Sequence, residues 1–153
     1  MEREVSVERV ISASPETLYA MVADVTRLSE WSPENTANRW IGSTPPGTVG
    51  ARFRGSNASG RWKWTTTCVV IAADAPNRFA FDVKDGPIAI ARWEYLFAAE
   101  GDGCRVTERW TDHRIGVFRW LSGLVLGIAD RAKHNERGMR HTLDALAASA
   151  ETG

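Results

Sequence analysis

The sequence predicts an α+β domain in which a curved antiparallel sheet of about seven strands wraps around a long C-terminal helix, with two short helices after the first strand. Segments of alternating apolar and polar residues follow one another through the middle of the chain. Short turns rich in Gly, Asp and Pro separate them, as in antiparallel hairpins. The last part of the chain changes to a helical repeat whose apolar stripe needs a sheet to cover it.

The N-terminal elements have clear local signals. Residues 4–12 alternate and predict a half-buried strand. Ser14 and Pro15 suit the N-cap and the first turn of a helix. A second short helix is expected at residues 24–31, ending before Pro33, because proline cannot continue a helix.

Six further strands follow from the alternation and from the turns between them. They are expected at residues 36–43, 49–57, 60–73, 77–84, 88–99 and 104–113. The final helical pattern covers residues 116–150 and is about 50 Å long at 1.5 Å per residue. Neither a repeat nor a linker is visible, so we expect a single domain over residues 1–153.

Composition excludes several function classes. The 153 residues carry 19 basic and 19 acidic side chains, so the formal net charge is zero. Domains that bind nucleic acid and polybasic membrane anchors show a basic surplus, so we expect neither partner. Without a membrane-length apolar stretch or a secretory signal, a cytoplasmic location is expected. Cys68 and Cys104 lack metal-ligand or disulfide spacing and are expected to be reduced and packed.

The seven tryptophans are the unusual feature of the composition. Alternation places side chains on the two faces of each strand, and a turn at 101–102 pairs Tyr95 with Glu108 and Trp93 with Trp110. A slip of one residue would invert the faces. The aromatic residues assigned to the concave face are Trp62, Trp64, Phe79, Phe81, Trp93, Tyr95, Phe97 and Trp110.

Two interpretations of these rings stay open. They either fill the core or line an apolar cavity of the kind that binds small molecules. We favour the cavity, because a curved sheet over one helix leaves a space that large flat rings line. The further residues expected to line it are Trp31 and Trp40 near the rim, Phe53, and Leu121, Leu124, Ile128 and Asn135 of the final helix.

Several segments, taken in order, make the chain similar to a known superfamily. They are ISASPETLYAMVADVTRLSEWSPE at 11–34, GARFRGSN at 50–57, RWKWTTTCVV at 61–70, RFAFDV at 78–83, ARWEYLFAAEGDGCRVTE at 91–108 and NERGMRHTLDALAASAE at 135–151. The chain resembles the START-like or SRPBCC superfamily, in particular its bacterial polyketide cyclase/dehydrase and lipid-transport-like branch. The resemblance implies the helix-grip fold over nearly the whole chain. Family members include ligand carriers, aromatase/cyclases and sensors, so the resemblance names no reaction.

Glu108 is the polar residue that stands out within this aromatic set. The predicted register turns it inward beside Tyr95 and Trp110. A carboxyl group there has a raised pKa unless a cation or hydrogen bonds compensate, and such a group suits a general acid or base. The alternative is a carboxylate near the sheet end, solvated or paired with an arginine. Asn135 likewise either contacts a ligand or bonds to the sheet backbone.

The remaining polar residues are assigned structural roles. Glu34 is expected to pair with Arg52 or Arg54. His134 and His141 are expected on the outer face of the final helix, about 10 Å apart along its axis and too far apart to share a metal ion. We therefore expect no metal and no cofactor.

Three functions remain as hypotheses. The first is binding of a small or medium hydrophobic ligand, such as a lipid-, polyketide- or aromatic-like molecule. The second is an aromatase/cyclase-like enzyme in which Glu108 and Tyr95 move protons. The third is a protein-interaction module, with a homodimer as one expectation, through an apolar shoulder of Phe118, Trp120 and Leu126 on the final helix.

Overall fold

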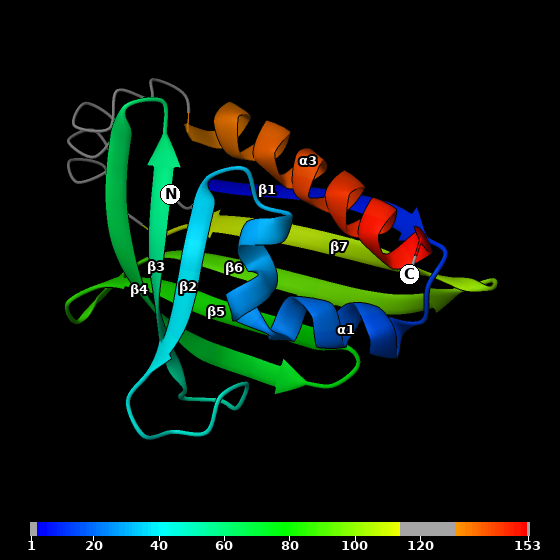
Figure 1. The fold of residues 1–153 in the computed structure, drawn as a ribbon, viewed down its shortest axis with the longest axis horizontal. Helices are drawn as coiled ribbons and strands as arrows, with labels where there is room; N and C mark the ends of the chain where they lie inside the picture. Colours follow the sequence, from blue (N-terminus) through cyan, green and yellow to red (C-terminus); the bar gives the residue numbers. More distant parts are fainter. Residues whose placement is uncertain (1–2, 114–130, 153) are drawn as a thin grey trace.

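A computed structural model describes residues 3–113 and 131–152 of the chain (Figure 1). Its seven strands form one antiparallel sheet in the order β1-β7-β6-β5-β4-β3-β2. The strands are β1 (Arg3–Ile11), β2 (Asn35–Ile41), β3 (Arg52–Ser59), β4 (Trp62–Asp74), β5 (Arg78–Asp85), β6 (Ile88–Glu100) and β7 (Gly103–Asp112). The helices are α1 (Pro15–Ala23), the 3-10 helix η1 (Val25–Glu30) and α3 (Arg131–Thr152). The predicted helix-grip architecture is confirmed.

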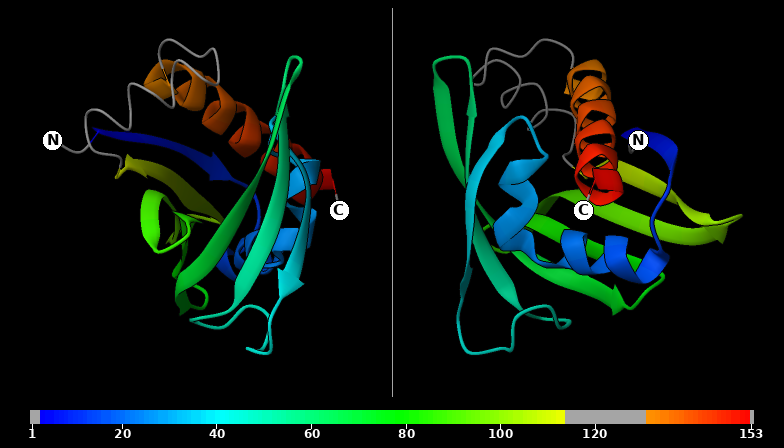
Figure 2. Two further views of the ribbon diagram at one scale, coloured as in Figure 1. Left: turned by 90° about the vertical axis from the view of Figure 1, so that its left-hand side faces the viewer. Right: turned by 45° about the vertical axis from the view of Figure 1, so that its right-hand side comes forward.

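The sheet bends strongly, so that the β3–β4 hairpin stands at a steep angle to β5, β6 and β7 (Figure 2). Helix α3 packs along β1, and α1 packs against β5 and β6 (Figure 1). Both helices lie on the concave side of the sheet. The space between the two helices is therefore bounded by the concave face.

The two short helices begin where their capping residues predict. The Ser14 side chain accepts a hydrogen bond from the Thr17 backbone N–H at 3.1 Å, and Pro15 occupies the first turn of α1. The Asp24 side chain caps η1 in the same way, accepting from the Thr26 N–H at 3.3 Å. The second short helix is thus present, although its turns are of the tighter 3-10 type.

The register of the β6–β7 hairpin agrees with the prediction. Phe97 lies opposite Val106, Tyr95 opposite Glu108, and Trp93 opposite Trp110. The alternation therefore places Tyr95, Glu108 and Trp110 on the concave face, where all three are buried. This register fixes the positions of the site residues that β6 and β7 contribute, which are Trp93, Tyr95, Glu108 and Trp110.

The packed core occupies one end of the concave face. Tyr19 of α1 contacts Phe79 and Phe97 edge-on, at centroid distances of 6.1 and 5.7 Å. From α3, the side chains of Met139 and Leu143 are almost fully buried. The predicted inward stripe of the final helix is confirmed over this described part.

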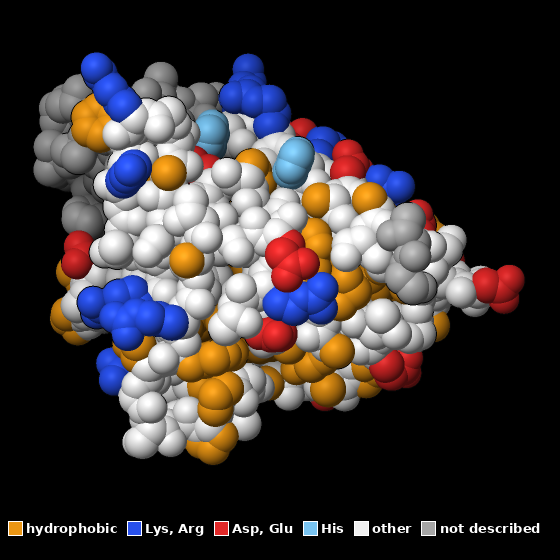
Figure 3. All heavy atoms as spheres, in the orientation of Figure 1, with side chains coloured by type: hydrophobic (Ala, Val, Ile, Leu, Met, Phe, Trp, Pro, Cys, Tyr) orange, Lys and Arg blue, Asp and Glu red, His pale blue; other side chains and the backbone are white. Residues whose placement is uncertain are grey.

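The outer face of the sheet carries its charges unevenly. On the strands β5–β7, Arg92 bonds to Asp82 at 2.8 Å and other arginines are paired similarly. On β2 and β3, Arg39 lies directly opposite Arg54, and both are exposed. Figure 3 shows Lys and Arg side chains gathered over this part of the molecule.

The expected starts of one strand and of the final helix differ from those in the structure. The strand expected to start at residue 49 starts at Arg52, because Gly47 and Gly50 adopt positive φ values in the preceding loop. The final helix was expected from residue 116, and the described helix starts at Arg131. The expectations for Leu121, Leu124, Ile128, Phe118, Trp120 and Leu126 lie outside the described residues.

Candidate functional site

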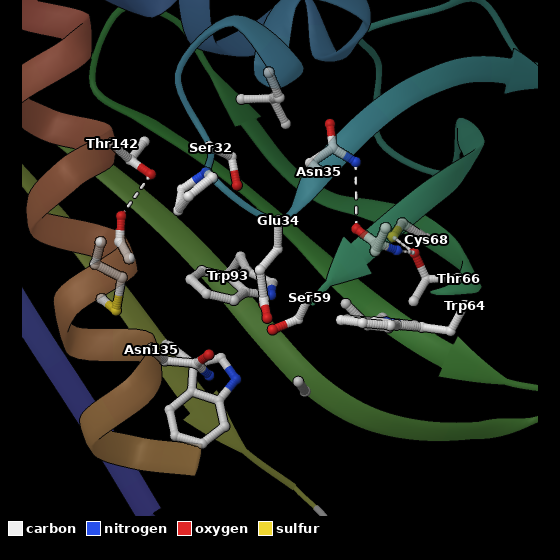
Figure 4. Close-up of a pocket in the computed structure, with 18 of the residues that line it drawn as sticks. Ser32, Glu34, Asn35, Ser59, Trp64, Thr66, Cys68, Trp93, Asn135 and Thr142 are labelled. Atoms are coloured by element: carbon white, nitrogen blue, oxygen red, sulfur yellow. Dashed lines mark hydrogen bonds between the residues drawn. The ribbon is translucent and has the colours of Figure 1, made fainter. Parts of the chain in front are cut away.

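A cavity of about 980 Å³ lies between the concave face of the sheet, helix α3 and the loop after η1. Figure 4 shows Glu34, Trp93 and Asn135 projecting into it from the loop, from β6 and from α3. Its apolar lining residues include Phe53, Trp64, Cys68, Phe81, Val83, Ile90, Ala91, Trp93, Trp110 and Met139. The volume is that of typical sites for small molecules.

Two neighbouring rows of side chains across the sheet form the deep wall of the cavity. In one row, Phe81 of β5, Trp93 of β6 and Trp110 of β7 lie side by side. The two indole rings are 6.5 Å apart and tilted by 45°. In the next row, Tyr95 lies beside Glu108. Tyr19 of α1 covers Phe79 in this second row and Phe97 in the row beyond it, so the Tyr95–Glu108 pair marks the inner end of the cavity.

The Tyr95–Glu108 pair is the most buried polar group of the cavity. The Tyr95 hydroxyl donates a hydrogen bond to Glu108 Oε2 at 2.8 Å, and Glu108 is only 2 % exposed. The other carboxyl oxygen, Oε1, is buried without a hydrogen-bond partner among the described residues. Of the two interpretations of Glu108, the inward, buried one is therefore confirmed.

Burial changes the acidity of both groups. It raises the pKa of Glu108 from 4.5 to about 8, and the hydrogen bond from Tyr95 offsets only part of this increase. Burial and the neighbouring Glu108 carboxyl also raise the pKa of Tyr95 well above its usual value. At neutral pH, the inner end of the cavity is therefore mostly uncharged.

A ladder of amide and hydroxyl groups lines the opposite wall. Asn35 Nδ2 donates to Asn38 Oδ1 at 2.8 Å and to Asn57 Oδ1 at 3.4 Å, and Asn57 Nδ2 donates to Thr66 Oγ1 at 3.3 Å. These residues belong to β2, β3 and β4, and all four line the cavity. Asn35 Oδ1 is buried without a partner among the described residues.

The ladder depends on a glycine. A Cβ atom at Gly55 would lie 2.8 Å from Asn38 Oδ1 and 3.0 Å from Thr66 Oγ1, which is closer than normal contact. The absence of a side chain on Gly55 therefore leaves the space in which the polar groups of β2 and β4 meet.

The rim of the cavity joins the loop after η1 to helix α3. Glu34 Oε2 and His134 Nε2 are 2.6 Å apart, and the backbone N–H of Ala58 donates to the Glu34 carbonyl at 2.9 Å. The expected partners of Glu34 were Arg52 or Arg54, and the structure gives it His134 instead. The expectation that both histidines lie on the outer face of the helix is wrong for His134, which is half-buried beneath the loop and lines the cavity. His141 also borders the cavity, but its side chain is exposed as expected.

The structure brings most of the described residues predicted for the site together. Phe53, Trp64, Phe81, Trp93, Tyr95, Glu108, Trp110 and Asn135 all line the cavity. Asn135 is 5 % exposed and lies near the start of α3, as its place on the apolar stripe predicts. No sequence pattern points to a site role for Asn35, Asn38 or His134, because their positions depend on how the loop crosses the sheet.

Four predicted residues are not among those that line the cavity. Trp31 is buried in the core at the end of η1, with the Arg27 guanidinium 5.0 Å from its ring centroid. Phe79 is covered by Tyr19 of α1, and Trp40 packs against Phe53.

Trp62 is the fourth of these residues, and its case differs. It lies at the start of β4 opposite Ser59, beside the turn of the hairpin, and is 43 % exposed. The alternation correctly places Trp62 and Trp64 on the same face of β4, but Trp62 lies so close to the hairpin turn that it is outside the cavity.

The described residues contain no group of three or more His, Cys, Asp or Glu positioned to hold a metal ion. Both cysteines are buried and free, and burial raises the pKa of the Cys68 thiol to about 12. None of the described helices has both the length and the apolar character that crossing a membrane requires.

Comparison with known proteins agrees with this architecture. Residues 2–151 match the model of the family described as polyketide cyclase / dehydrase and lipid transport. The chain belongs to this family. A search of curated proteins found no match to the chain.

Solved structures similar to this family member span several kinds of organism. The Polyketide_cyc-like protein of Corynebacterium glutamicum is 28 % identical, with a TM-score of 0.68 over 99 % of this chain and 93 % of the other. The di-domain ARO/CYC protein StfQ from the steffimycin biosynthetic pathway is 12 % identical, with a TM-score of 0.76 over 99 % of this chain and 51 % of the other.

A plant protein shares the fold as well. The major latex-like protein 151 of Panax ginseng is 10 % identical, with a TM-score of 0.64 over 92 % of this chain and 97 % of the other. At these identities, the likeness to the ginseng protein and to StfQ establishes the fold alone.

Proposed function

We propose that the chain binds a small or medium hydrophobic molecule in the cavity between the sheet and α3. The observation that carries this proposal is the cavity itself, about 980 Å³ in volume and lined by Trp64, Trp93 and Trp110 together with further apolar side chains. Burial of an apolar molecule against these rings supplies the binding free energy, at about 25 cal/mol per Å² of apolar surface removed from water.

The distribution of polar groups supports the same proposal. Glu108 and Tyr95 stand at the inner end, and the asparagine ladder of Asn35, Asn38 and Asn57 lines one wall. A few convergent polar groups in an apolar wall orient a ligand without dominating its affinity. The family description, with its polyketide cyclases and lipid transport proteins, agrees with a ligand of this class.

A cavity-filling substitution tests the proposal. Ala91 lines the cavity, whereas Ala98 on the same strand is exposed and points to the other face. We expect naphthalene-class compounds to bind wild-type protein saturably with one molecule per chain, and Ala91→Trp to abolish this binding. Ala98→Trp is the matched control and retains it.

Calorimetric titration of the three proteins measures the result. Absence of saturable binding to the wild type, or equal binding by Ala91→Trp, would contradict the proposal. Circular dichroism and unfolding curves confirm that each variant is folded before its affinity is compared.

A second candidate function is supported by one specific observation, the buried Tyr95–Glu108 pair at the cavity wall. A carboxyl group whose pKa lies near neutrality is suited to proton transfer, and this one lies where a polyketide chain would be enclosed. An aromatase/cyclase-like enzyme would use Glu108 as general acid or base, with Tyr95 holding it in place.

Turnover of a poly-β-ketone substrate tests this second candidate. Glu108→Gln retains the size of the side chain but cannot exchange a proton in the same way, so a catalytic role predicts a loss of about 100-fold or more in rate. Unchanged turnover in Glu108→Gln would eliminate the enzymatic function and leave the binding function intact.

A further inference from the structure

Glu108 occupies a position that restricts the chemistry of the bound molecule. Its neighbours across the sheet are Val7 on β1 and Tyr95 on β6. The next residue pair along the same two strands is Trp93 and Trp110, whose rings line the cavity. A molecule lying against these two indoles would bring one end to the Glu108 carboxyl group.

Within residues 3–113 and 131–152, no cation is paired with the carboxyl group. Among the described residues, no ion pair involves Glu108, and Val7 and Tyr95 beside it carry no positive charge. The titratable side chains that α3 contributes to the cavity are His134, Arg137 and His141, and His134 is engaged with Glu34 at the rim. A buried carboxylate without a cation is strongly unfavourable, so the neutral acid is the stable form. The raised pKa of Glu108, about 8, agrees with this conclusion.

The hydrogen bond from Tyr95 places the acid proton. Because the Tyr95 hydroxyl donates to Oε2, the carboxyl proton belongs on Oε1. Oε1 is buried and has no partner among the described residues. The neutral carboxyl group is therefore a buried O–H donor to which the described ranges supply no acceptor, an arrangement that is unfavourable until an acceptor binds.

On the basis of the function proposed above, we propose that the bound molecule is a neutral carbonyl compound with an apolar, ring-bearing body, whose carbonyl oxygen accepts a hydrogen bond from Glu108 Oε1. A carbonyl oxygen offers an acceptor without bringing a donor of its own. An alcohol would add a second O–H to be satisfied, and a carboxylate would need a cation, which the described part of the chain does not place beside Glu108. The rings of Trp93 and Trp110 then contact the apolar body.

Two matched probes separate the carbonyl contact from general apolar binding. The ketone 2-acetylnaphthalene and the hydrocarbon 2-isopropylnaphthalene have nearly the same size and shape. We expect the wild type to bind the ketone at least about tenfold more tightly at about pH 6, since satisfying a buried donor is worth about one factor of ten or more.

Two variants test whether Glu108 is the donor. Glu108→Gln keeps an N–H donor at this position and is expected to keep the ketone preference. The double variant Tyr95→Phe/Glu108→Leu removes donor and acceptor together, so neither of these two positions keeps a buried polar group that needs a partner. It is expected to bind both probes with equal affinity, at about the wild-type affinity for the hydrocarbon.

Infrared spectroscopy and pH supply readouts that a merely structural role would not change. The carbonyl stretching frequency of the bound, isotope-labelled ketone is expected to be lower in the wild type than in the double variant. Raising the pH to about 9 ionises Glu108, so the wild type loses its ketone preference whereas Glu108→Gln keeps its own.

The outcomes are distinguishable. Equal affinity of the wild type for the two probes, or a ketone preference that survives in the double variant, would overturn the carbonyl proposal while leaving the cavity as a binding site. Failure of both probes to bind to any of the proteins would count against the proposed binding function itself.

Discussion

Glu108 has an environment that makes the stability of the fold depend on pH. Burial raises its pKa from 4.5 to about 8, so the folded chain holds this proton more tightly than the unfolded chain. The stabilisation is complete below about pH 4.5, declines as the pH rises towards 8 and is lost above that value. A shift of this size corresponds to a loss on the order of several kcal/mol in the free energy of unfolding.

Glu108→Gln removes this titration and is the reference for its measurement. Urea unfolding at a series of pH values between about 5 and 9 gives the free energy of unfolding of both proteins. We expect the wild type to lose stability relative to Glu108→Gln as the pH rises. Two parallel curves would mean that Glu108 is ionised to the same extent in the folded and unfolded chains.

Gly55 supports the second polar wall of the cavity by having no side chain. Gly55→Ala would place a Cβ 2.8 Å from Asn38 Oδ1, so the amide ladder must shift. We expect a loss of about 1–3 kcal/mol in the free energy of unfolding, as for other overpacked sites. Urea unfolding measures it, and in an Asn38→Ala background the same substitution is expected to be less harmful. An equal loss of unfolding free energy in both backgrounds would show that the clash with the amide ladder is not its cause.

At the residue scale, the sequence predicts the sheet face and the cross-strand partner of a residue, because strand alternation controls both. Tyr95 and Glu108 were paired correctly because a two-residue turn and a period of two leave only one register that keeps Val106 inside. His134 was not predicted, because its contact with Glu34 arises between residues 100 positions apart, across a loop without regular structure.

At the scale of elements, β2 and β3 differ from the rest of the sheet in their charges. Arg39 and Arg54 lie directly opposite one another, and no ion pair joins either of them to an acidic residue in the described ranges 3–113 and 131–152. Like charges in directly opposed positions destabilise a strand pair. The β5–β7 strands, by contrast, pair Arg92 with Asp82 across the sheet.

Reversing one of the two charges is expected to stabilise the β2–β3 pair. Arg39→Glu converts the repulsion into an attraction and should raise the free energy of unfolding by roughly 0.5–1 kcal/mol at low salt. Arg39→Glu/Arg54→Glu restores like charges and should return to about the wild-type value. A gain that is the same at high salt, or that persists in the double variant, would point to a cause other than charge pairing.

Element positions were predicted more reliably than the contacts between elements. The alternating segments and the Ser14-Pro15 start signal located the strands and α1 to within a few residues. That α1 covers Phe79, and so removes it from the cavity wall, depends on how the helix crosses the sheet. Neither the period nor the turn signals of the sequence contain that information.

At the scale of the whole molecule, the fold leaves a large part of its concave face unpacked. A ligand that binds only the folded chain adds stability by mass action, about 2.7 kcal/mol at 100 times its dissociation constant. For a chain of this length, that corresponds to a rise of roughly 5–10 °C in Tm. We expect 2-acetylnaphthalene to raise the Tm of the wild type and of Ala98→Trp, and to leave that of Ala91→Trp unchanged.

Thermal unfolding followed by circular dichroism checks this expectation. An equal rise in all three proteins would indicate binding outside the cavity. A rise confined to Ala91→Trp and absent from the wild type would contradict the assignment of Ala91 to the cavity wall.

The tryptophans allow the central claim to be tested directly, because each indole N–H gives its own NMR signal. In a titration of the wild type with 2-acetylnaphthalene, we predict that the signals of Trp64, Trp93 and Trp110 shift and saturate at one molecule per chain. The signal of Trp62, which lies outside the cavity and is partly exposed, should stay in place. Unchanged signals of the three cavity residues, or a largest shift at Trp62, would contradict a binding site between the sheet and α3.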